Sequence, residues 1–308
     1  MKTYIYVPTR SRVKRQTTRE GFLLNYLPKD EFVVRYVINE HEKDDWTGYD
    51  VDLLLMPRDY RIGRIRQALL ERHVAHPEER YQVWLDDDLR LYCTNDATFE
   101  KFLAMEPGPE RKALIDEQYR RPRYGCRPAM LQDSIDFLRW CRQRMEEGFP
   151  QVSCAASDVR QYWSLALNDR TLCHPLHPEE RIGARVQQIH GVDTKLIHDL
   201  GIYIGALNEW EDAHLGLSLF ESGYENLITY RWTQQQNGSN KPGGCSVTRN
   251  LENYNEATQE LARLHPRYVK PRPVRSKGSF WGGERLGASI EWEQAVRDCH
   301  ERRRGKGV

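Results

Sequence analysis

Three consecutive carboxylates, Asp86, Asp87 and Asp88, directly follow the apolar run from Tyr81 to Leu85. Side chains of an extended chain alternate, which predicts Asp86 and Asp88 on one face and Asp87 on the other. Such oxygen ligands suit a hard divalent cation, Mn²⁺ or Mg²⁺, with water and a diphosphate completing its coordination. A surface acidic turn is the alternative. We expect Asp86 and Asp88 to bind metal, and Asp86 and Asp87 to contact a nucleotide-diphosphate donor.

A second acidic group, Glu209-Trp210-Glu211-Asp212, precedes a helical pattern of apolar residues. Either Asp212 or Glu211 could simply cap that helix, an interaction worth about 1 kcal/mol. A cap does not require several carboxylates and an indole together. A carboxylate beside an aromatic ring suits a general base that deprotonates an attacking hydroxyl. We therefore expect Asp212, or Glu211 in its place, to be catalytic, with the helix cap as the alternative.

Basic and polar residues follow the first strands of the pattern, where a nucleotide and its phosphates would lie. Guanidinium groups and helix N-termini both favour phosphate. The donor-site candidates are Pro8, Thr9, Arg10, Arg12, Arg15, Asn39, Arg61 and Arg64. His265 is a candidate third metal ligand, although a lone histidine is more often structural.

Strand-like runs at residues 3–8, 32–39, 51–56 and 81–85 alternate with helical patterns, including an amphipathic helix over residues 62–73. The arginines of that helix, Arg66 among them, lie off its apolar stripe. This alternation predicts an α/β fold with a Rossmann-like, mixed and mostly parallel sheet flanked by helices. Ligands of such sheets bind outside the carboxyl ends of the strands, so the polar residues after each run should converge.

The rest of the chain yields further expected elements. Helices are predicted over residues 129–147, 212–222, 255–264 and from 289 onward, and strand segments over 152–156, 189–193 and 202–207. The predicted organisation is one domain over 1–288, with an insertion or lid at 96–127 and a flexible loop at 234–246, followed by a C-terminal helix and basic tail at 289–308.

The composition narrows the class of protein. The 308 residues carry a net charge of +1, which argues against a strongly basic nucleic-acid binder. The longest apolar runs are far shorter than the roughly 18 residues of a membrane span, and the first residues lack a signal-peptide pattern, so we expect a cytoplasmic protein without membrane contact or an obligate protein partner. The seven cysteines lack paired spacing, and Cys173, His174 and His177 lack a second ligand pair for zinc.

Several motifs occur in a recognisable order. They are Pro8-Thr-Arg10, Val37-Ile-Asn-Glu40, Arg61-Ile-Gly-Arg-Ile-Arg-Gln-Ala68, Leu85-Asp-Asp-Asp-Leu89 and the run from Glu211-Asp212 to Gly223-Tyr224. Over residues 3–95 and 150–285 the chain resembles the GT-A glycosyltransferases. Most specifically it is similar to the TET-associated DNA glycosyltransferases of bacteriophages, relatives of the kinetoplastid base J glucosyltransferase.

The resemblance implies that a UDP-sugar is the donor and that a 5-hydroxymethylpyrimidine in DNA, 5-hydroxymethylcytosine above all, is the acceptor. It implies an inverting reaction with Asp212 as base, in the cytoplasm of a host cell. An extruded base would need stacking and basic groups. The acceptor-binding candidates are Trp210, Arg123, Tyr124, Tyr268, Lys270, Trp281 and Arg285. A protein, glycan or small-molecule acceptor is one alternative, and a non-catalytic nucleotide- or DNA-binding module is another.

Overall fold

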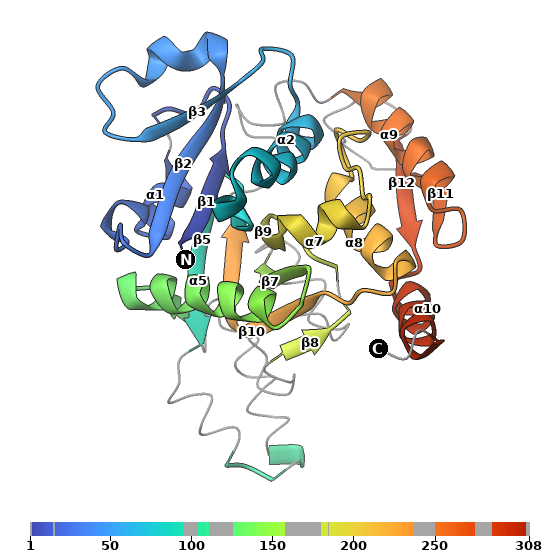
Figure 1. Ribbon diagram of the computed structural model, residues 1–308. Helices are drawn as coiled ribbons and strands as arrows, with labels where there is room; N and C mark the ends of the chain where they lie inside the picture. The colour runs from blue at the N-terminus through green and yellow to red at the C-terminus, as the bar shows by residue number, and fades with distance from the viewer. Residues whose placement is uncertain are drawn as a thin grey trace.

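The structure, a computed structural model, describes residues 2–14, 16–94, 104–106, 108–110, 126–157, 180–183, 185–236, 250–274 and 285–305. Within these residues a ten-stranded sheet has the order β3-β2-β1-β4-β9-β7-β10-β5-β6, and β8 pairs with β10 (Figure 1). The strands are β1 (Thr3–Pro8), β2 (Phe32–Asn39), β3 (Asp52–Met56), β4 (Tyr81–Leu85), β5 (Leu89–Thr94), β6 (Cys126–Pro128), β7 (Gln151–Ser157), β8 (Glu180–Ile182), β9 (Ile189–Asp193) and β10 (Leu227–Gln236).

The first four strands pair in parallel, and their bounds follow the apolar runs of the sequence closely. β7, β10 and β6 run in the same direction as these four, whereas β9, β5 and β8 run against them. The predicted α/β class, with a mixed and mostly parallel sheet flanked by helices, is confirmed. β1 to β4 therefore end at one edge of the sheet.

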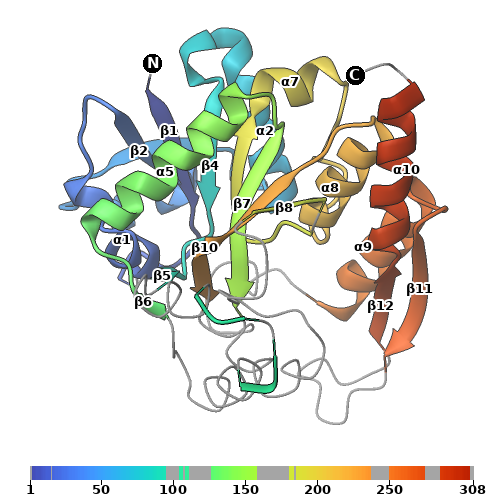
Figure 2. The same ribbon diagram turned by 90° about the horizontal axis from the view of Figure 1, so that it is seen from below.

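Helices cover both faces of the sheet (Figures 1 and 2). One face buries Ile5 and Val83 against α1 and α5, and the other buries Tyr6 and Trp84 against α2, α7 and α8. The helices are α1 (Thr17–Gly21), α2 (Ile62–Ala75), α5 (Leu131–Glu146), α7 (Thr194–Asp199), α8 (Glu211–Glu221), α9 (Leu251–Leu264) and α10 (Trp292–Gly305), with short 3-10 turns η1 (Leu24–Tyr26), η2 (Glu40–Trp46) and η3 (Pro77–Glu79). Among the described helices, none combines the length and the apolar character needed to cross a membrane.

A third apolar cluster joins the outer side of α8 to α9, α10 and the hairpin of β11 (Val269–Val274) and β12 (Arg285–Ile290). These elements gather beside α8 at the right of Figure 1. Ala295 and Cys299 of α10 are fully buried in this cluster. The expected domain end at residue 288 falls inside β12. The terminal helix α10 also shares this cluster with residues that precede it in the chain.

One predicted strand is absent from the structure, and the described ends of two predicted loops belong to strands. Residues 202–207 form no strand, and residues 234–236 complete β10, while the rest of the predicted loop to residue 246 lies outside the described residues. Of the predicted insertion at 96–127, most lies outside them too, and its last residues belong to β6, which pairs with β5. β5 and β10 were not predicted, because their pairing joins residues that are distant in sequence.

A buried carboxylate, Glu79, ties β1 and β2 to α2. Its oxygens accept hydrogen bonds from Tyr6 Oη at 2.5 Å, Arg35 Nη1 at 2.5 Å and Arg72 Nε at 2.6 Å, and its side chain is 1% exposed. Burial opposes ionisation, but hydrogen bonds from Arg72, Tyr6 and Arg35 outweigh it and lower the pKa of Glu79 from 4.5 to about 2. The ionised form of Glu79 therefore stabilises the fold.

Glu79→Gln is expected to reduce the free energy of unfolding at pH 7 by about 3 kcal/mol, because two partly buried guanidinium groups lose their buried anion. The folded pKa lies below the unfolded value, so this contribution is complete above pH 4.5 and is lost as the pH falls toward 2. Urea unfolding of both proteins at several pH values measures the difference, which should narrow below pH 4.5. Glu78→Gln, at a neighbouring side chain that is 57% exposed, is the matched control and should change little. A constant difference down to pH 3 would contradict this assignment.

Candidate active site

The acidic turn that follows β4 is held on both sides by hydrogen bonds to its backbone. Thr18 Oγ1 donates to the carbonyl oxygen of Asp86 at 2.5 Å and accepts from the backbone N–H of Leu89 at 2.9 Å. The backbone N–H of Asp86 donates to the carbonyl of Gln188 at 3.1 Å. Two distant parts of the chain, at Thr18 and at Gln188, thus fix the position of this turn.

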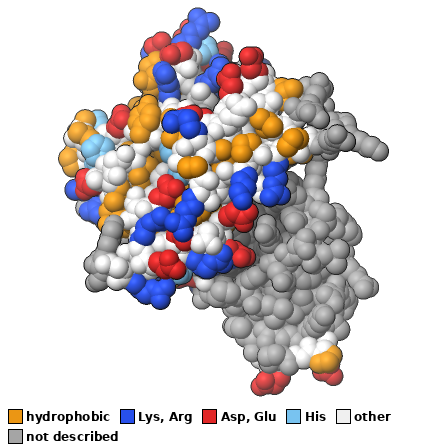
Figure 3. All heavy atoms as spheres, turned by 90° about the vertical axis from the view of Figure 1, so that its right-hand side faces the viewer, with side chains coloured by type: hydrophobic (Ala, Val, Ile, Leu, Met, Phe, Trp, Pro, Cys, Tyr) orange, Lys and Arg blue, Asp and Glu red, His pale blue; other side chains and the backbone are white. Residues whose placement is uncertain are grey.

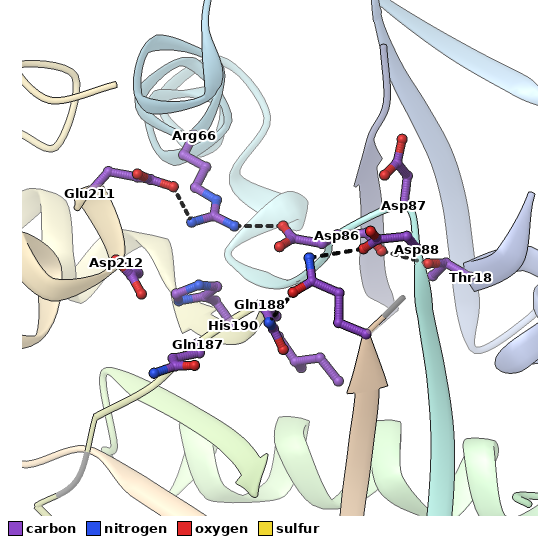
Figure 4. A network of polar contacts seen from close by, with 12 residues as sticks. Thr18, Arg66, Asp86, Asp87, Asp88, Gln187, Gln188, His190, Glu211 and Asp212 are labelled. Carbon is purple, nitrogen blue, oxygen red and sulfur yellow. Dashed lines mark hydrogen bonds and ion pairs between the residues drawn. The ribbon is translucent and has the colours of Figure 1, made fainter. Parts of the chain in front are cut away.

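The three carboxylates of the turn have different partners (Figure 4). Asp86 accepts from Arg66 Nη2 at 2.9 Å, and Asp88 accepts from Gln236 Nε2 at 3.1 Å. Asp87 accepts from Thr9 Oγ1 at 2.8 Å and pairs with Arg12. The alternation predicted for an extended chain ends with β4, because Asp87 and Asp88 lie in a turn. Asp87 therefore anchors the loop that follows β1.

Arg66 joins the two acidic segments of the sequence. Its Nη2 lies 2.9 Å from Asp86 Oδ1 and its Nη1 lies 2.8 Å from Glu211 Oε1. The residue is only 3% exposed, although it lies off the apolar stripe predicted for α2. Burial raises the pKa of Asp86 to about 7 and that of Glu211 to about 8, against the lowering effect of Arg66. Nearby carboxylates, Asp212 among them, raise both pKa values further.

Asp212 and Trp210 lie at the start of α8. The helix begins at Glu211, and Trp210 occupies the cap position with a left-handed φ of 68° and no side-chain cap bond. The alternative role of Asp212 or Glu211 as the cap is thus not observed. Asp212 Oδ1 accepts from the N–H of Ala213 at 2.8 Å, and Oδ2 lies 3.5 Å from Arg185 Nη2. Its second oxygen faces the same space as Arg66 and Glu211 (Figure 4).

A pocket of about 300 Å³ opens where β1 and β2 end. This volume is at the lower end of the range for small-molecule sites. It is lined by the end of β1, the first turn of α2, the loop before α8 and one side of α9. The lining residues are Pro8, Thr9, Arg10, Asn39, Tyr60, Arg61, Ile62, Ile65, Ala206, Leu207, Asn208, Glu209, Asn253, Glu256, Ala257 and Glu260.

The predicted donor-site residues divide into three groups. Pro8, Thr9, Arg10, Asn39 and Arg61 line the pocket. The amide of Asn39 also donates to the carbonyl oxygen of Pro57 at 2.7 Å, so this side chain shapes the loop before α2.

Arg12 and Arg64 do not line the pocket. Arg12 pairs with Asp87, and its Nη1 lies 3.3 Å from Asp88 Oδ2. Arg64 has a side chain that is 56% exposed and lies 4.0 Å from Asp59. Arg15 lies outside the described residues.

Gly63 permits the close approach of α2 to the loop that lines the pocket. A Cβ at this position would lie 1.8 Å from the carbonyl oxygen of Leu207 and 2.9 Å from its carbonyl carbon. No side-chain adjustment relieves a clash with backbone atoms. Gly63 therefore keeps residues 206–209 against the first turn of α2.

Gly63→Ala is expected to lower the free energy of unfolding by roughly 1–3 kcal/mol and to weaken ligand binding, because residues 206–209 must move. Gly216→Ala is the matched control, since its Cβ would lie 3.5 Å from the nearest Trp292 atom, an ordinary contact. That helical substitution should stabilise the fold by about 0.5–1 kcal/mol. Thermal unfolding and UDP titration of both variants test the pair. Equal stability of the two variants would refute the close-approach argument.

Two predicted site residues are buried away from any ligand. His265 Nε2 lies 2.7 Å from His214 Nδ1, and His265 Nδ1 lies 2.9 Å from Glu221 Oε2. Both ring nitrogens are thus engaged, and His265 is not among the residues that line the pocket. Tyr268 is 0% exposed and donates to Asp298 Oδ2 at 2.7 Å, so it belongs to the third apolar cluster and not to an acceptor surface.

The remaining acceptor candidates are only partly placed by the structure. Trp210 and Arg285 are brought together through Tyr254, with ring centroids of Trp210 and Tyr254 5.6 Å apart and Arg285 Cζ 5.2 Å from the Tyr254 centroid. Trp210 also contacts a second arginine, since Arg185 Cζ lies 5.8 Å from the centroid of its ring. The sequence did not single out Tyr254 or Arg185. Lys270 is exposed on β11, while Arg123, Tyr124 and Trp281 lie outside the described residues.

The residues of the acidic turn carry the kind of ligand atoms that a hard divalent cation requires. Asp86 and Asp88 supply carboxylate oxygens, and burial raises the pKa of both side chains. The neighbouring carboxylates raise the pKa of Asp86 further. A hard cation would relieve that unfavourable anionic excess. Within the described ranges, neither aspartate forms part of a three-residue group with closely spaced ligand atoms. A bound diphosphate and water would supply further oxygen ligands.

Comparison with solved structures finds remote similarities. The chain is 14% identical to S. aureus TarS 1-349 in complex with UDP, over 86% of this chain and 65% of that one, at a TM-score of 0.41. The mannosyltransferase PcManGT from Pyrobaculum calidifontis, in complex with GDP-Man and Mn²⁺, is 13% identical over 76% of this chain and 56% of its own, also at 0.41. GalNAc-T7 with UDP, GalNAc and Mn²⁺ is 12% identical over 76% and 43%, at 0.39. No protein-family model and no curated protein matches the chain. At these values the overlap assigns neither a family nor a substrate.

Proposed function

We propose that this chain is a metal-dependent glycosyltransferase of GT-A type that transfers a sugar from a UDP-sugar to an acceptor hydroxyl. One observation carries the proposal. Asp86 and Glu211 lie 125 residues apart in the sequence (211 − 86), yet both bind the buried guanidinium of Arg66 beside a pocket at the ends of β1 and β2. A structural ion pair would not need the further carboxylates of Asp88 and Asp212 on either side.

The two acidic segments are assigned separate tasks. Asp86 and Asp88 would hold Mn²⁺ or Mg²⁺, which neutralises the charge of a departing diphosphate when bound. The adjoining pocket takes the nucleoside, with Ile62 and Ile65 offering apolar surface and Arg10 a cation for phosphate. Asp87 holds Thr9 and Arg12 in place and so keeps the end of β1 in register with the acidic turn.

Asp212 is the preferred general base. Glu211 is committed to Arg66, whereas Asp212 Oδ2 has only a 3.5 Å contact with Arg185 and a side chain that is 18% exposed. In the proposed step the acceptor oxygen bonds to the anomeric carbon, its proton passes to Asp212, and the bond to the diphosphate breaks. Attack opposite the leaving group inverts the anomeric configuration.

For the acceptor we propose a 5-hydroxymethylpyrimidine in DNA, most specifically 5-hydroxymethylcytosine. The sequence motifs resemble those of phage DNA glycosyltransferases, and the row of Arg185, Trp210, Tyr254 and Arg285 beside Asp212 offers stacking and cationic groups of the kind that bind extruded bases. The face that carries α9, β11 and α10 has acidic and basic side chains interspersed (Figure 3). Strand binding is therefore expected close to the row and not across this whole face.

The proposal is tested by incubating the protein with UDP-glucose, UDP-galactose or UDP-N-acetylglucosamine and Mn²⁺. Release of UDP that stops on chelation is expected, and labelled sugar should appear on 5-hydroxymethylcytosine DNA but not on unmodified DNA. UDP release without transfer to any hydroxymethylated duplex or single strand would exclude the DNA acceptor. No turnover of any nucleotide sugar would overturn the proposed function as a whole.

A further inference from the structure

His190, on β9, is held in one tautomer by a chain of amides. Its Nδ1 lies 3.1 Å from Gln151 Nε2, and Gln151 Oε1 accepts from Asn226 Nδ2 at 3.1 Å. Because the oxygen of Gln151 is engaged by Asn226, its amide nitrogen donates to His190. Nδ1 is thus the acceptor, and the proton of the neutral ring resides on Nε2. Burial, aided by the charge of Arg66, holds the pKa of His190 well below its usual value.

Among the residues that the structure describes, the Nε2–H group of His190 has no hydrogen-bond partner. The residue is 0% exposed, and its Nε2 is a buried atom. A donor that is buried without a partner loses its hydrogen bonds to water, which is unfavourable. In Figure 4 the ring of His190 lies between Asp212 and Gln188, beneath Arg66 and Glu211. The unused donor is therefore located between the two halves of the candidate site.

Two amide oxygens without partners belong to the same network. Gln188 donates its Nε2 to Gln236, and Gln234 donates its Nε2 to the carbonyl of Gln187 at 2.6 Å. The Oε1 atoms of Gln188 and Gln234 are buried without a hydrogen bond. Gln188 also has a left-handed φ of 63°, a conformation that costs energy for a residue other than glycine. The backbone of Gln188 is thus held in this conformation by the surrounding structure and not by its own conformational preference.

We infer that His190, together with the neighbouring Gln188, forms hydrogen bonds with one hydroxyl group of the transferred sugar and restricts the donor to neutral hexoses. The inference rests on the proposed function. A hydroxyl both donates and accepts, so it can pair with an N–H donor and with an amide oxygen at the same time. A sugar carboxylate would meet those amide oxygens and the carboxylates of Asp86 and Asp212, all of which repel it. In this role His190 positions and selects the sugar, while Asp212 accepts the proton of the acceptor hydroxyl.

The test uses His190→Leu, which removes the donor, and His190→Gln, which retains an N–H. Values of kcat/KM are measured for the best of the three donors named above and for its 2-, 3-, 4- and 6-deoxy analogues. In the wild type one analogue should lose about 10- to 100-fold, the value of one buried hydrogen bond. That penalty should shrink to within about 2-fold in His190→Leu and return in part in His190→Gln, while UDP affinity stays unchanged in both.

A purely structural role would lower all five rates in parallel and leave every deoxy penalty as it is in the wild type, and that result overturns the inference. Nitrogen-15 spectra of labelled histidine supply a readout that needs no turnover. They should show the Nε2–H tautomer, with a shift on addition of the UDP-sugar that UDP alone does not produce. A ring protonated on Nδ1 would also overturn it. Absence of turnover in the wild type with every donor instead refutes the proposed function.

Discussion

Asp86→Asn and Asp88→Asn are each expected to reduce Mn²⁺-dependent release of UDP from the donor by about 100- to 1,000-fold. Each substitution removes one carboxylate charge from the group that would hold the cation, and charge stabilisation of a leaving group at such sites is worth that much. Asparagine preserves the shape of the turn, so the loss reports charge. The measurement is the initial rate of UDP release across a series of Mn²⁺ concentrations.

Two controls separate charge at the metal from stability of the turn. Asp87→Asn weakens the contacts with Thr9 and Arg12, so it should lower the melting temperature. It should have little effect on the Mn²⁺ dependence of UDP release. Asp136→Asn, at an exposed position of α5 that accepts a hydrogen bond from Gln132, should change neither. Full activity of Asp86→Asn at ordinary Mn²⁺ concentrations would remove Asp86 from the metal site.

Asp212→Asn should abolish transfer to the acceptor, with a fall in kcat of about 100- to 10,000-fold, the usual contribution of a general base. The affinity for UDP should remain within about 2-fold, because Asp212 is not among the residues that line the pocket and Glu211 still holds Arg66. Transfer to 5-hydroxymethylcytosine DNA and UDP titration measure the two quantities. An active Asp212→Asn enzyme would move the catalytic role to Glu211 or Glu209.

Glu211→Gln is the informative companion to that variant. It leaves the buried guanidinium of Arg66 with Asp86 but without its second anion, so a lower melting temperature is expected along with reduced transfer. Asp212→Asn, which removes only a 3.5 Å contact with Arg185, should leave the melting temperature nearly unchanged. The two neighbouring carboxylates are thereby distinguished by stability as well as by rate.

The local part of the fold was predictable from the sequence. The apolar runs of β1 to β4 carry their own boundaries, and the polar residues that end them were expected to approach one another, as Thr9 and Asp87 do. These features depend on short-range patterning and on the direction of parallel strands, which a single sequence retains.

The rest depended on pairing between distant segments. Arg66 lies off the apolar stripe of α2, and nothing near it in sequence shows that Asp86 and Glu211 will enclose it. Burial of His265 and Tyr268 has no local signal for the same reason. His265 contacts His214 and Glu221 of α8, and Tyr268 donates to Asp298 of α10. His190 had no local signal at all, and its environment depends on Gln151 of another strand.

The guanidinium of Arg66 is shared between a carboxylate of the donor half and one of the acceptor half of the site. A cation that takes over Asp86 would leave Arg66 to Glu211 alone, and a change in one half is thereby transmitted to the other as a coupling free energy. Binding of the cation with the nucleotide sugar should consequently change the affinity for the acceptor, and binding of the acceptor should change the affinity for the donor by the same factor. Titration of each ligand in the absence and presence of the other measures this factor.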